Sequence, residues 1–126
     1  MALLETYVSN LKAIPPDVPK KNRIFVMRNR GHDHLAPNKE LFQNFKAREA
    51  ELKKEGLDTV SSHNQAYADV HFETRFTDQI MSNSDAVREL TEIRKRAKKE
   101  DVYLVCYEKP PKQCHRFLLI KIIEQL

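Results

Sequence analysis

The residues most able to do chemistry lie close together near the end of the chain. Cys114, His115 and Arg116 are consecutive, and Cys106 and Glu108 come shortly before them. A thiol beside cationic side chains at a helix start has a lowered pKa, so Cys114 is a candidate nucleophile, with Glu108 and His115 as candidate acid and base groups. Cys106 and Arg116 are candidate ligand-binding residues, since a guanidinium suits phosphate or carboxylate. The pattern predicts a catalytic or anion-binding site.

The same residues also have structural interpretations. Cysteine is common in protein cores, and Cys106 is expected to be buried at the end of an apolar strand. Glu108 and Arg116 could form a buried ion pair that fixes the loop between them instead of acting in catalysis. Cys114 is accordingly either a reactive thiol or a residue that shapes a pocket.

Three of these residues carry donor atoms that zinc prefers, namely Cys106, Cys114 and His115. Four further histidines could supply the remaining ligand: His32, His34, His63 and His71. Their spacing matches none of the paired, short-spaced patterns of zinc sites, so we expect no metal and no cofactor. Cys114-x-Arg116 is also too short for a phosphatase loop, and the sequence has no glycine-rich phosphate loop.

Three short apolar runs are predicted to be strands, and their ends determine where the site lies. Residues 102–106 are the clearest strand, residues 24–27 are flanked by charged residues, and residues 3–8 precede a proline-rich loop. In a parallel sheet, ligands bind beyond the carboxyl ends of strands, where the next helix begins. Residues 106–116 occupy such a position.

Helices are predicted between the second and third strands and at the end of the chain. Asparagine at position 38 can cap a helix over residues 38–56, and Ser84 with Asp85 can start one that runs to the lysines at 98 and 99. Residues 117–126 predict a mostly buried final helix. Residues 68–80 fit both a strand and a helix, because their apolar side chains alternate and also recur at every fourth position.

Length and composition indicate one domain over residues 1–126. With 40% hydrophobic and 32% charged residues, the composition predicts a folded chain. Strands that alternate with helices predict an α/β domain with a small, mostly parallel sheet of three to four strands flanked by helices. Two cysteines make no disulfide framework, and we find neither an export signal nor a membrane-spanning run, so a cytoplasmic location without membrane contact is expected. The net charge of +4 permits a phosphate-bearing partner.

The stretch from Leu104 to Pro110, followed by Cys-His-Arg at 114–116 and an apolar helix, resembles the signature of the Domain of Unknown Function 488 family. Weaker similarity extends upstream through Lys12 to Pro15, Ile24 to Arg28, Leu35-Ala36-Pro37, and Phe72 with Phe76. The resemblance implies a compact α/β domain and favours a helix around Phe72. It marks Cys106, Glu108, Cys114, His115 and Arg116, and adds Lys12 and Arg28 as ligand-binding candidates. The chain departs from the family at residues 5–7 and cannot be aligned over residues 56–65.

Together these observations predict a small enzyme or enzyme-like domain. An anionic ligand, such as a nucleotide or nucleic-acid phosphate, would lie against Arg116, His115 and the helix amides, with Cys114 or Glu108 reactive. One alternative is a nucleotide- or nucleic-acid-binding module without chemistry. Another is a structural protein that forms a homodimer through its last helix.

Overall fold

Three parallel strands position the site. In the computed structural model, which describes residues 2–126, they are β1 (Leu3–Tyr7), β2 (Arg23–Phe25) and β3 (Val102–Cys106), in the order β1-β3-β2. The register pairs Tyr7 with Cys106 and Phe25 with Val105, so all three carboxyl ends meet at one edge of the sheet. The predicted small parallel sheet is confirmed. β2 is shorter than expected, although the Val26 N–H still donates to the Val105 carbonyl at 3.0 Å.

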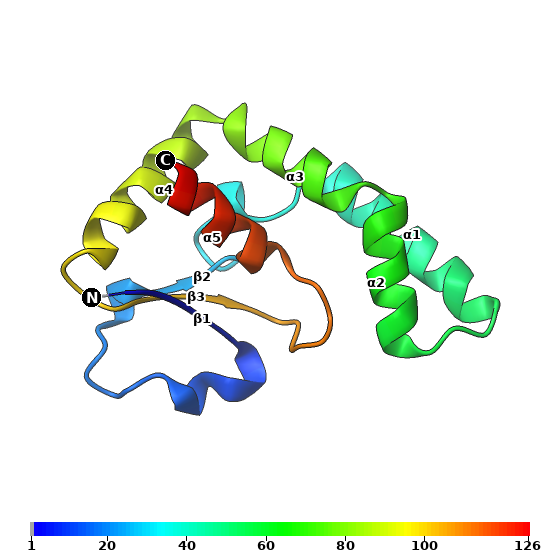
Figure 1. The fold of residues 1–126 in the computed structure, drawn as a ribbon, viewed down its shortest axis with the longest axis horizontal. Helices are drawn as coiled ribbons and strands as arrows, with labels where there is room; N and C mark the ends of the chain where they lie inside the picture. The colour runs from blue at the N-terminus through cyan, green and yellow to red at the C-terminus, as the bar shows by residue number, and fades with distance from the viewer. Residues whose placement is uncertain (1) are drawn as a thin grey trace.

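Most of the chain between β2 and β3 is helical (Figure 1). The α-helices are α1 (Lys39–Lys54), α2 (Thr59–Asp69), α3 (Phe72–Met81), α4 (Ser84–Ala97) and α5 (His115–Gln125). The short 3-10 helices are η1 (Val8–Ala13), η2 (Lys20–Asn22) and η3 (Asp33–Leu35). The ambiguous segment is therefore helical, as the family resemblance favoured. It is divided by His71, whose left-handed backbone (φ 55°) separates α2 from α3.

Polar side chains cap the N-termini of α1, α2 and α4. The side-chain oxygen of Asn38 accepts from the Leu41 N–H at 2.8 Å, as predicted, and Asp58 caps α2 in the same way. α4 begins at Ser84, but its cap is Asn83, whose side chain accepts from the amides of Asp85 and Ala86. Asparagine accepts from exposed amides as well as serine or aspartate does, which explains the shift by one residue.

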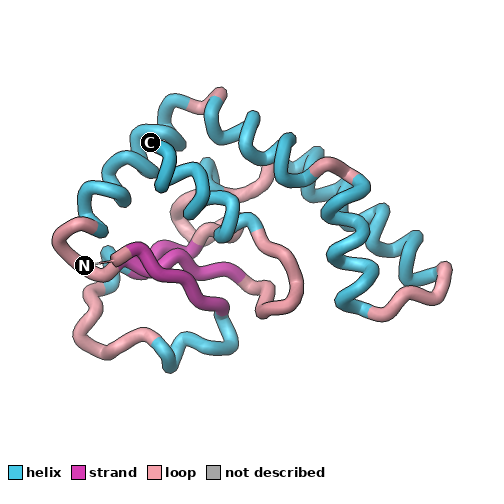
Figure 2. The backbone as a smooth tube through the Cα atoms, viewed as in Figure 1, coloured by secondary structure: helices cyan, strands magenta, loops and turns pink. Residues whose placement is uncertain are grey.

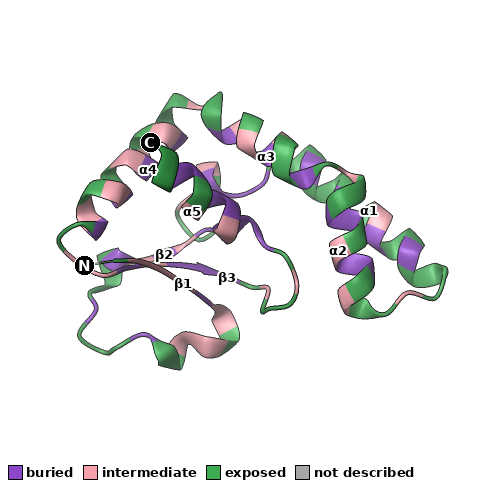
Figure 3. Cartoon of the chain, viewed as in Figure 1, coloured by how far each residue is buried: buried purple, intermediate pink, exposed green. Residues whose placement is uncertain are grey.

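The two faces of the sheet are covered differently. Leu104 and Cys106 face the main core between the sheet and the helices, whereas Val105 packs on Ile14 and Val18 from the segment after β1. Figure 2 shows the helices on one side of the sheet and mostly loop on the other. The buried faces of α3, α4 and α5 turn toward the same core (Figure 3). The side chain of Cys106 therefore points to the helical layer.

α1 and α2 stand beyond the carboxyl edge of the sheet, where they face the loop that leads into α5 (Figure 1). Within residues 2–126, no helix combines the length and the apolar character needed to cross a bilayer.

Candidate functional site

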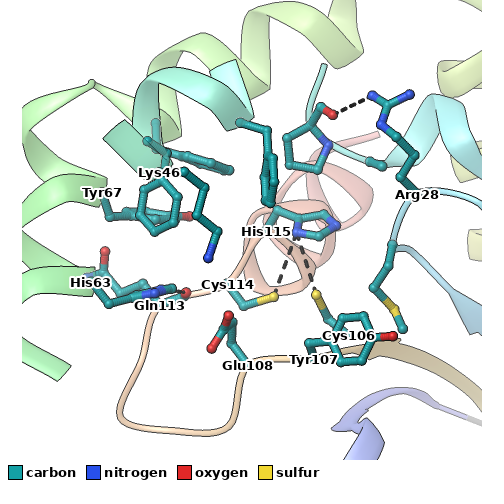
Figure 4. Close-up of a pocket in the computed structure, with 16 residues that line it drawn as sticks. Arg28, Lys46, His63, Tyr67, Cys106, Tyr107, Glu108, Gln113, Cys114 and His115 are labelled. Carbon is teal, nitrogen blue, oxygen red and sulfur yellow. Dashed lines mark hydrogen bonds between the residues drawn. The ribbon is translucent and has the colours of Figure 1, made fainter. Parts of the chain in front are cut away.

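Three donor atoms meet where β3 ends and α5 begins. Cys106 is the last residue of β3, Cys114 directly precedes α5, and His115 is its first residue. Each sulfur lies 3.7 Å from Nδ1 of His115 (Figure 4). The two cysteines are each 4% exposed and the histidine 6%. The turn around Pro110 and Pro111 brings the two ends of the loop together.

His115 is held in one orientation by the neighbouring strand. Its Nε2 lies 2.7 Å from the carbonyl oxygen of Val26, and a carbonyl can only accept, so Nε2 carries a proton. Phe76 packs on the ring edge at a centroid distance of 5.3 Å. Nδ1 is thereby directed at both sulfurs.

The two thiols differ in protonation because they interact with each other. Cys106, the largest cause, and His115 lower the pKa of Cys114 well below its usual value. The same interaction, with burial, raises the pKa of Cys106 far above its usual value. The two shifts favour a thiolate at Cys114 over one at Cys106. The sequence named the helix start, His115 and Arg116 as causes; His115 and the backbone N–H of Arg116 contribute, and the main cause is Cys106.

A cavity of about 350 Å³ opens beside this cluster. Its aromatic walls come from α1, α2, α3 and the end of β3, and they include Phe42, Phe45, Tyr67, Phe72 and Tyr107. Arg28 and Lys46 supply cationic groups, and Glu108 supplies a carboxylate that points toward Cys114 (Figure 4). Burial raises the pKa of Tyr67, so this residue presents a neutral phenol. The cavity therefore combines an aromatic wall with groups of both charge signs.

The comparison with protein families agrees with the motif at this site. The family model described as "Active DUF488-N3 subclade" matches residues 10–126. The chain belongs to this family. The match confirms the resemblance and includes all the cluster residues of this DUF488 protein. Neither the search of curated proteins nor the search of solved structures found a match.

Arg116 lies outside the cavity of the DUF488 domain. Its side chain is 0% exposed, with Nε 2.8 Å from the Glu5 carboxylate and one nitrogen donating to the Glu108 carbonyl. The guanidinium also packs on the Phe117 ring at 4.3 Å. The alternative ion pair between Arg116 and the Glu108 carboxylate is wrong, because that carboxylate is 3.4 Å from Lys112. Arg116 instead joins the start of α5 to β1.

The remaining predicted cations are divided between cavity and surface. Arg28 lines the cavity and donates from one nitrogen to the Pro37 carbonyl at 2.8 Å. Lys12 lies in η1 and is not part of the cavity wall. The structure therefore brings together Cys106, Glu108, Cys114, His115 and Arg28, and leaves Lys12 and Arg116 apart from them.

Sequence reasoning missed the contribution of α1 and α2. His63, which the sequence analysis named only as a possible fourth metal ligand, is buried; its Nε2 lies 2.7 Å from the Gln113 carbonyl, and its Nδ1 is 3.4 Å from Glu49. Lys46 and Tyr67 complete this side of the cavity. A usable signal was present, since His63 and Tyr67 are four residues apart on one helical face. The segment was overlooked because residues 56–65 could not be aligned with the family.

Proposed function

We propose that this DUF488 domain is a small enzyme that binds an anionic ligand with a flat ring, of the nucleotide class, and acts on it at the Cys106, Cys114 and His115 cluster. One observation carries the proposal: the thiolate cluster shares its cavity with aromatic walls and two cations. Cavities from about 300 Å³ upward are of the size that holds small ligands. The description of the family model as an active subclade agrees with a catalytic role.

Cationic groups for the ligand come from Lys46 and Arg28, and not from Arg116. Figure 4 shows the Lys46 ammonium group directed toward Cys114. Its nitrogen is 3.4 Å from Glu49 and 5.6 Å from the centroids of both neighbouring phenylalanine rings, so the charge is held at the cavity wall. Arg28 uses one nitrogen on Pro37, and its guanidinium has further donors for an anion.

Aromatic side chains provide the surface for a ring. Tyr67 and Phe72 stack with centroids 4.4 Å apart and an interplanar angle of 16°. Phe45 meets Phe72 edge-on at 5.9 Å. Stacked and edge-on aromatic contacts are each worth about 1 kcal/mol beyond the area they bury, so a nucleobase gains more here than phosphate alone.

Glu108 is the general base of the proposal. Its side chain is 29% exposed, and its carboxylate pairs with Lys112 at 3.4 Å and points toward Cys114 in Figure 4. A carboxylate in this position can accept a proton from a ligand or from water beside the cluster.

The test is calorimetric titration of the reduced protein with nucleoside 5′-monophosphates and with inorganic phosphate. We expect a nucleotide to bind more tightly than phosphate, and Lys46→Met and Arg28→Met each to weaken binding about tenfold through the loss of a charged contact. Lys12→Met is the matched control and should bind normally. Absence of nucleotide binding, or equal affinity in Lys46→Met, would overturn the proposal.

A turnover assay distinguishes an enzyme from a binding module without chemistry. Each nucleotide that binds is incubated with wild type and with Cys114→Ser, and products are identified by mass spectrometry. Product from the wild type alone supports catalysis. Binding without product in either protein would favour the non-catalytic module.

A further inference from the structure

We infer that Cys106, Cys114 and His115 form a three-ligand site for a divalent transition metal ion of the zinc class, with its fourth position open to the cavity. The inference deepens the proposed function by naming what makes the cluster reactive. Metal binding itself can be measured without any nucleotide, so the two ideas can fail separately.

The distances between the donor atoms fit a tetrahedral ion. Zinc bonds of about 2.3 Å to sulfur and about 2.0 Å to nitrogen place a sulfur and a nitrogen ligand about 3.5 Å apart at the tetrahedral angle. Both sulfur-to-Nδ1 distances are 3.7 Å, and the three donor atoms all lie within 4.8 Å of one another. Two sulfurs on one zinc are about 3.8 Å apart, so the cysteines need to approach by at most about 1 Å.

The orientation of His115 is the one a metal ligand needs. Histidine ligands usually donate their second ring N–H to a carbonyl or carboxylate, which fixes the ring and leaves the other nitrogen free to coordinate. Here the Val26 carbonyl takes the Nε2 proton at 2.7 Å, and Nδ1 faces both sulfurs. The orienting group is main chain at the end of β2, and all three donors lie at the ends of regular elements, so the site is preorganised.

The chemistry of the three ligands limits which metal ions can bind. Two cysteines and one histidine are soft or borderline donors, which suit zinc and similar ions better than magnesium or calcium. On binding, Cys106 would release its proton to solvent, so that two thiolates balance the charge of a divalent ion inside a buried site. The spacing Cys-x7-Cys-His does not reveal these three ligands in the sequence. They come together only because the end of β3 and the start of α5 meet across a turn.

The open fourth position links the ion to the cavity. All three ligands line the cavity wall, so an ion held by them faces the space where a ligand binds. Three protein ligands plus one open position is the arrangement of catalytic zinc sites, whereas structural sites have four protein ligands. Glu108 lies on the same wall and would accept a proton from water on the ion.

Cobalt(II) titration tests the site directly. The full chain is reduced with a phosphine, stripped with a chelator, and titrated without oxygen so that no disulfide forms. We expect one equivalent of cobalt to produce the near-ultraviolet sulfur-to-cobalt charge-transfer band and the visible bands of tetrahedral cobalt, and one equivalent of zinc to remove them. Wild type that shows no charge-transfer band would overturn the inference.

Variants identify the ligands. Cys106→Ser, Cys114→Ser and His115→Asn should each lose the tetrahedral spectrum. A double variant, His32→Asn with His34→Asn, removes the surface histidines that flank Glu89 at 3.0 and 3.1 Å and should keep it. Far-ultraviolet circular dichroism checks that each protein is folded, and Cys106→Ser, the smallest change, keeps the test decisive if His115→Asn unfolds. An unchanged spectrum in folded Cys106→Ser and Cys114→Ser would refute the assignment.

The outcomes separate this inference from the proposed function. Cobalt binding without nucleotide binding supports the metal site and removes the nucleotide proposal. Nucleotide binding with no cobalt band, together with rapid alkylation of Cys114, overturns the metal site and leaves Cys114 as a free nucleophile.

Discussion

The pKa values of the two cysteines in this cluster are shifted in opposite directions. The pKa of Cys106 is raised and that of Cys114 is lowered, while the Val26 carbonyl directs His115 toward both sulfurs. The sequence correctly predicted a low pKa for Cys114 and named the helix start, His115 and Arg116 as causes, but it did not name Cys106, the largest cause. The real partner is eight residues away and reaches Cys114 only after the loop has folded back. Such proximity cannot be read from spacing alone.

Removal of the Cys106 thiol should raise the pKa of Cys114. Cys106→Ala deletes the donor that contributes most to the low pKa, so less Cys114 is thiolate at acidic pH. In metal-free, reduced wild type, alkylation of Cys114 by iodoacetamide should keep its rate down to about pH 5, whereas in Cys106→Ala the rate should fall there. Mass spectrometry of the labelled peptide gives the rates.

The control for this experiment is Cys106→Ser, which retains a hydroxyl donor and should stay close to wild type. Identical rate profiles for Cys106→Ala and wild type would show that Cys106 does not set the state of Cys114.

Arg116 is expected to stabilise the fold. Its guanidinium is fully buried, and Glu5 supplies the neutralising carboxylate at 2.8 Å. Glu5→Leu leaves a buried cation without its partner and should lower the free energy of unfolding by about 3 kcal/mol in urea denaturation. Glu92→Leu is the control, because Glu92 pairs with Lys95 on the surface and should cost no more than about 1 kcal/mol. Equal losses in both variants would contradict this role for Arg116.

At the scale of elements, α2 determines where the loop before α5 lies. His63 contacts the Gln113 carbonyl, and the Asn64 side chain donates to the Pro111 carbonyl at 3.1 Å and accepts from the Gln113 N–H at 2.9 Å. The strands and helices themselves were largely predictable, because apolar periodicity and capping residues are local signals. The attachment of α2 to a loop about 50 residues later depends on tertiary packing, which the sequence does not display.

Loss of the Asn64 contacts should loosen this loop. Asn64→Ala removes both hydrogen bonds, so amide hydrogen exchange at Gln113 should become faster, as mass spectrometry of the peptide can show. The free energy of unfolding should fall by about 1 kcal/mol, since alanine regains some stability as a better helix former. Gln65→Ala is the matched control: the Gln65 side chain donates to Asp69 of the same helix, so exchange at Gln113 should not change. Unaltered amide exchange at Gln113 in Asn64→Ala would show that α2 does not hold the loop in place.

At the scale of the whole molecule, the α/β class and the position of the site at the carboxyl edge were predictable. Parallel strands of apolar residues followed by helices allow few arrangements. The unequal covering of the two sheet faces could not be predicted, because Ile14 and Val18 are separated by prolines and give no periodic signal. Glu5 and Arg116 are 111 residues apart, and their pairing appears only in the folded chain.

The burial of α5 argues for a monomer over the homodimer through the last helix that the sequence allowed. Leu118, Leu119, Ile122 and Ile123 are buried within the same chain, which leaves α5 little apolar surface for a second copy. Gel filtration over a dilution series should therefore give one elution volume, that of a monomer. An elution volume that shifts with concentration would support a homodimer instead.

A metal ion at the cluster would join parts of the molecule that are distant in sequence, and it should therefore stabilise the whole fold. Its ligands come from β3 and α5, and the orienting carbonyl follows β2. An ion that binds only the folded state adds about 2.7 kcal/mol at a free concentration of one hundred times its Kd. Zinc should thus raise the Tm of wild type but not that of Cys114→Ser. Thiol ligands release protons on binding, so the zinc-induced rise in Tm should shrink as the pH falls. A rise of equal size in Cys114→Ser, or one that grows toward acidic pH, would place the stabilising ion elsewhere.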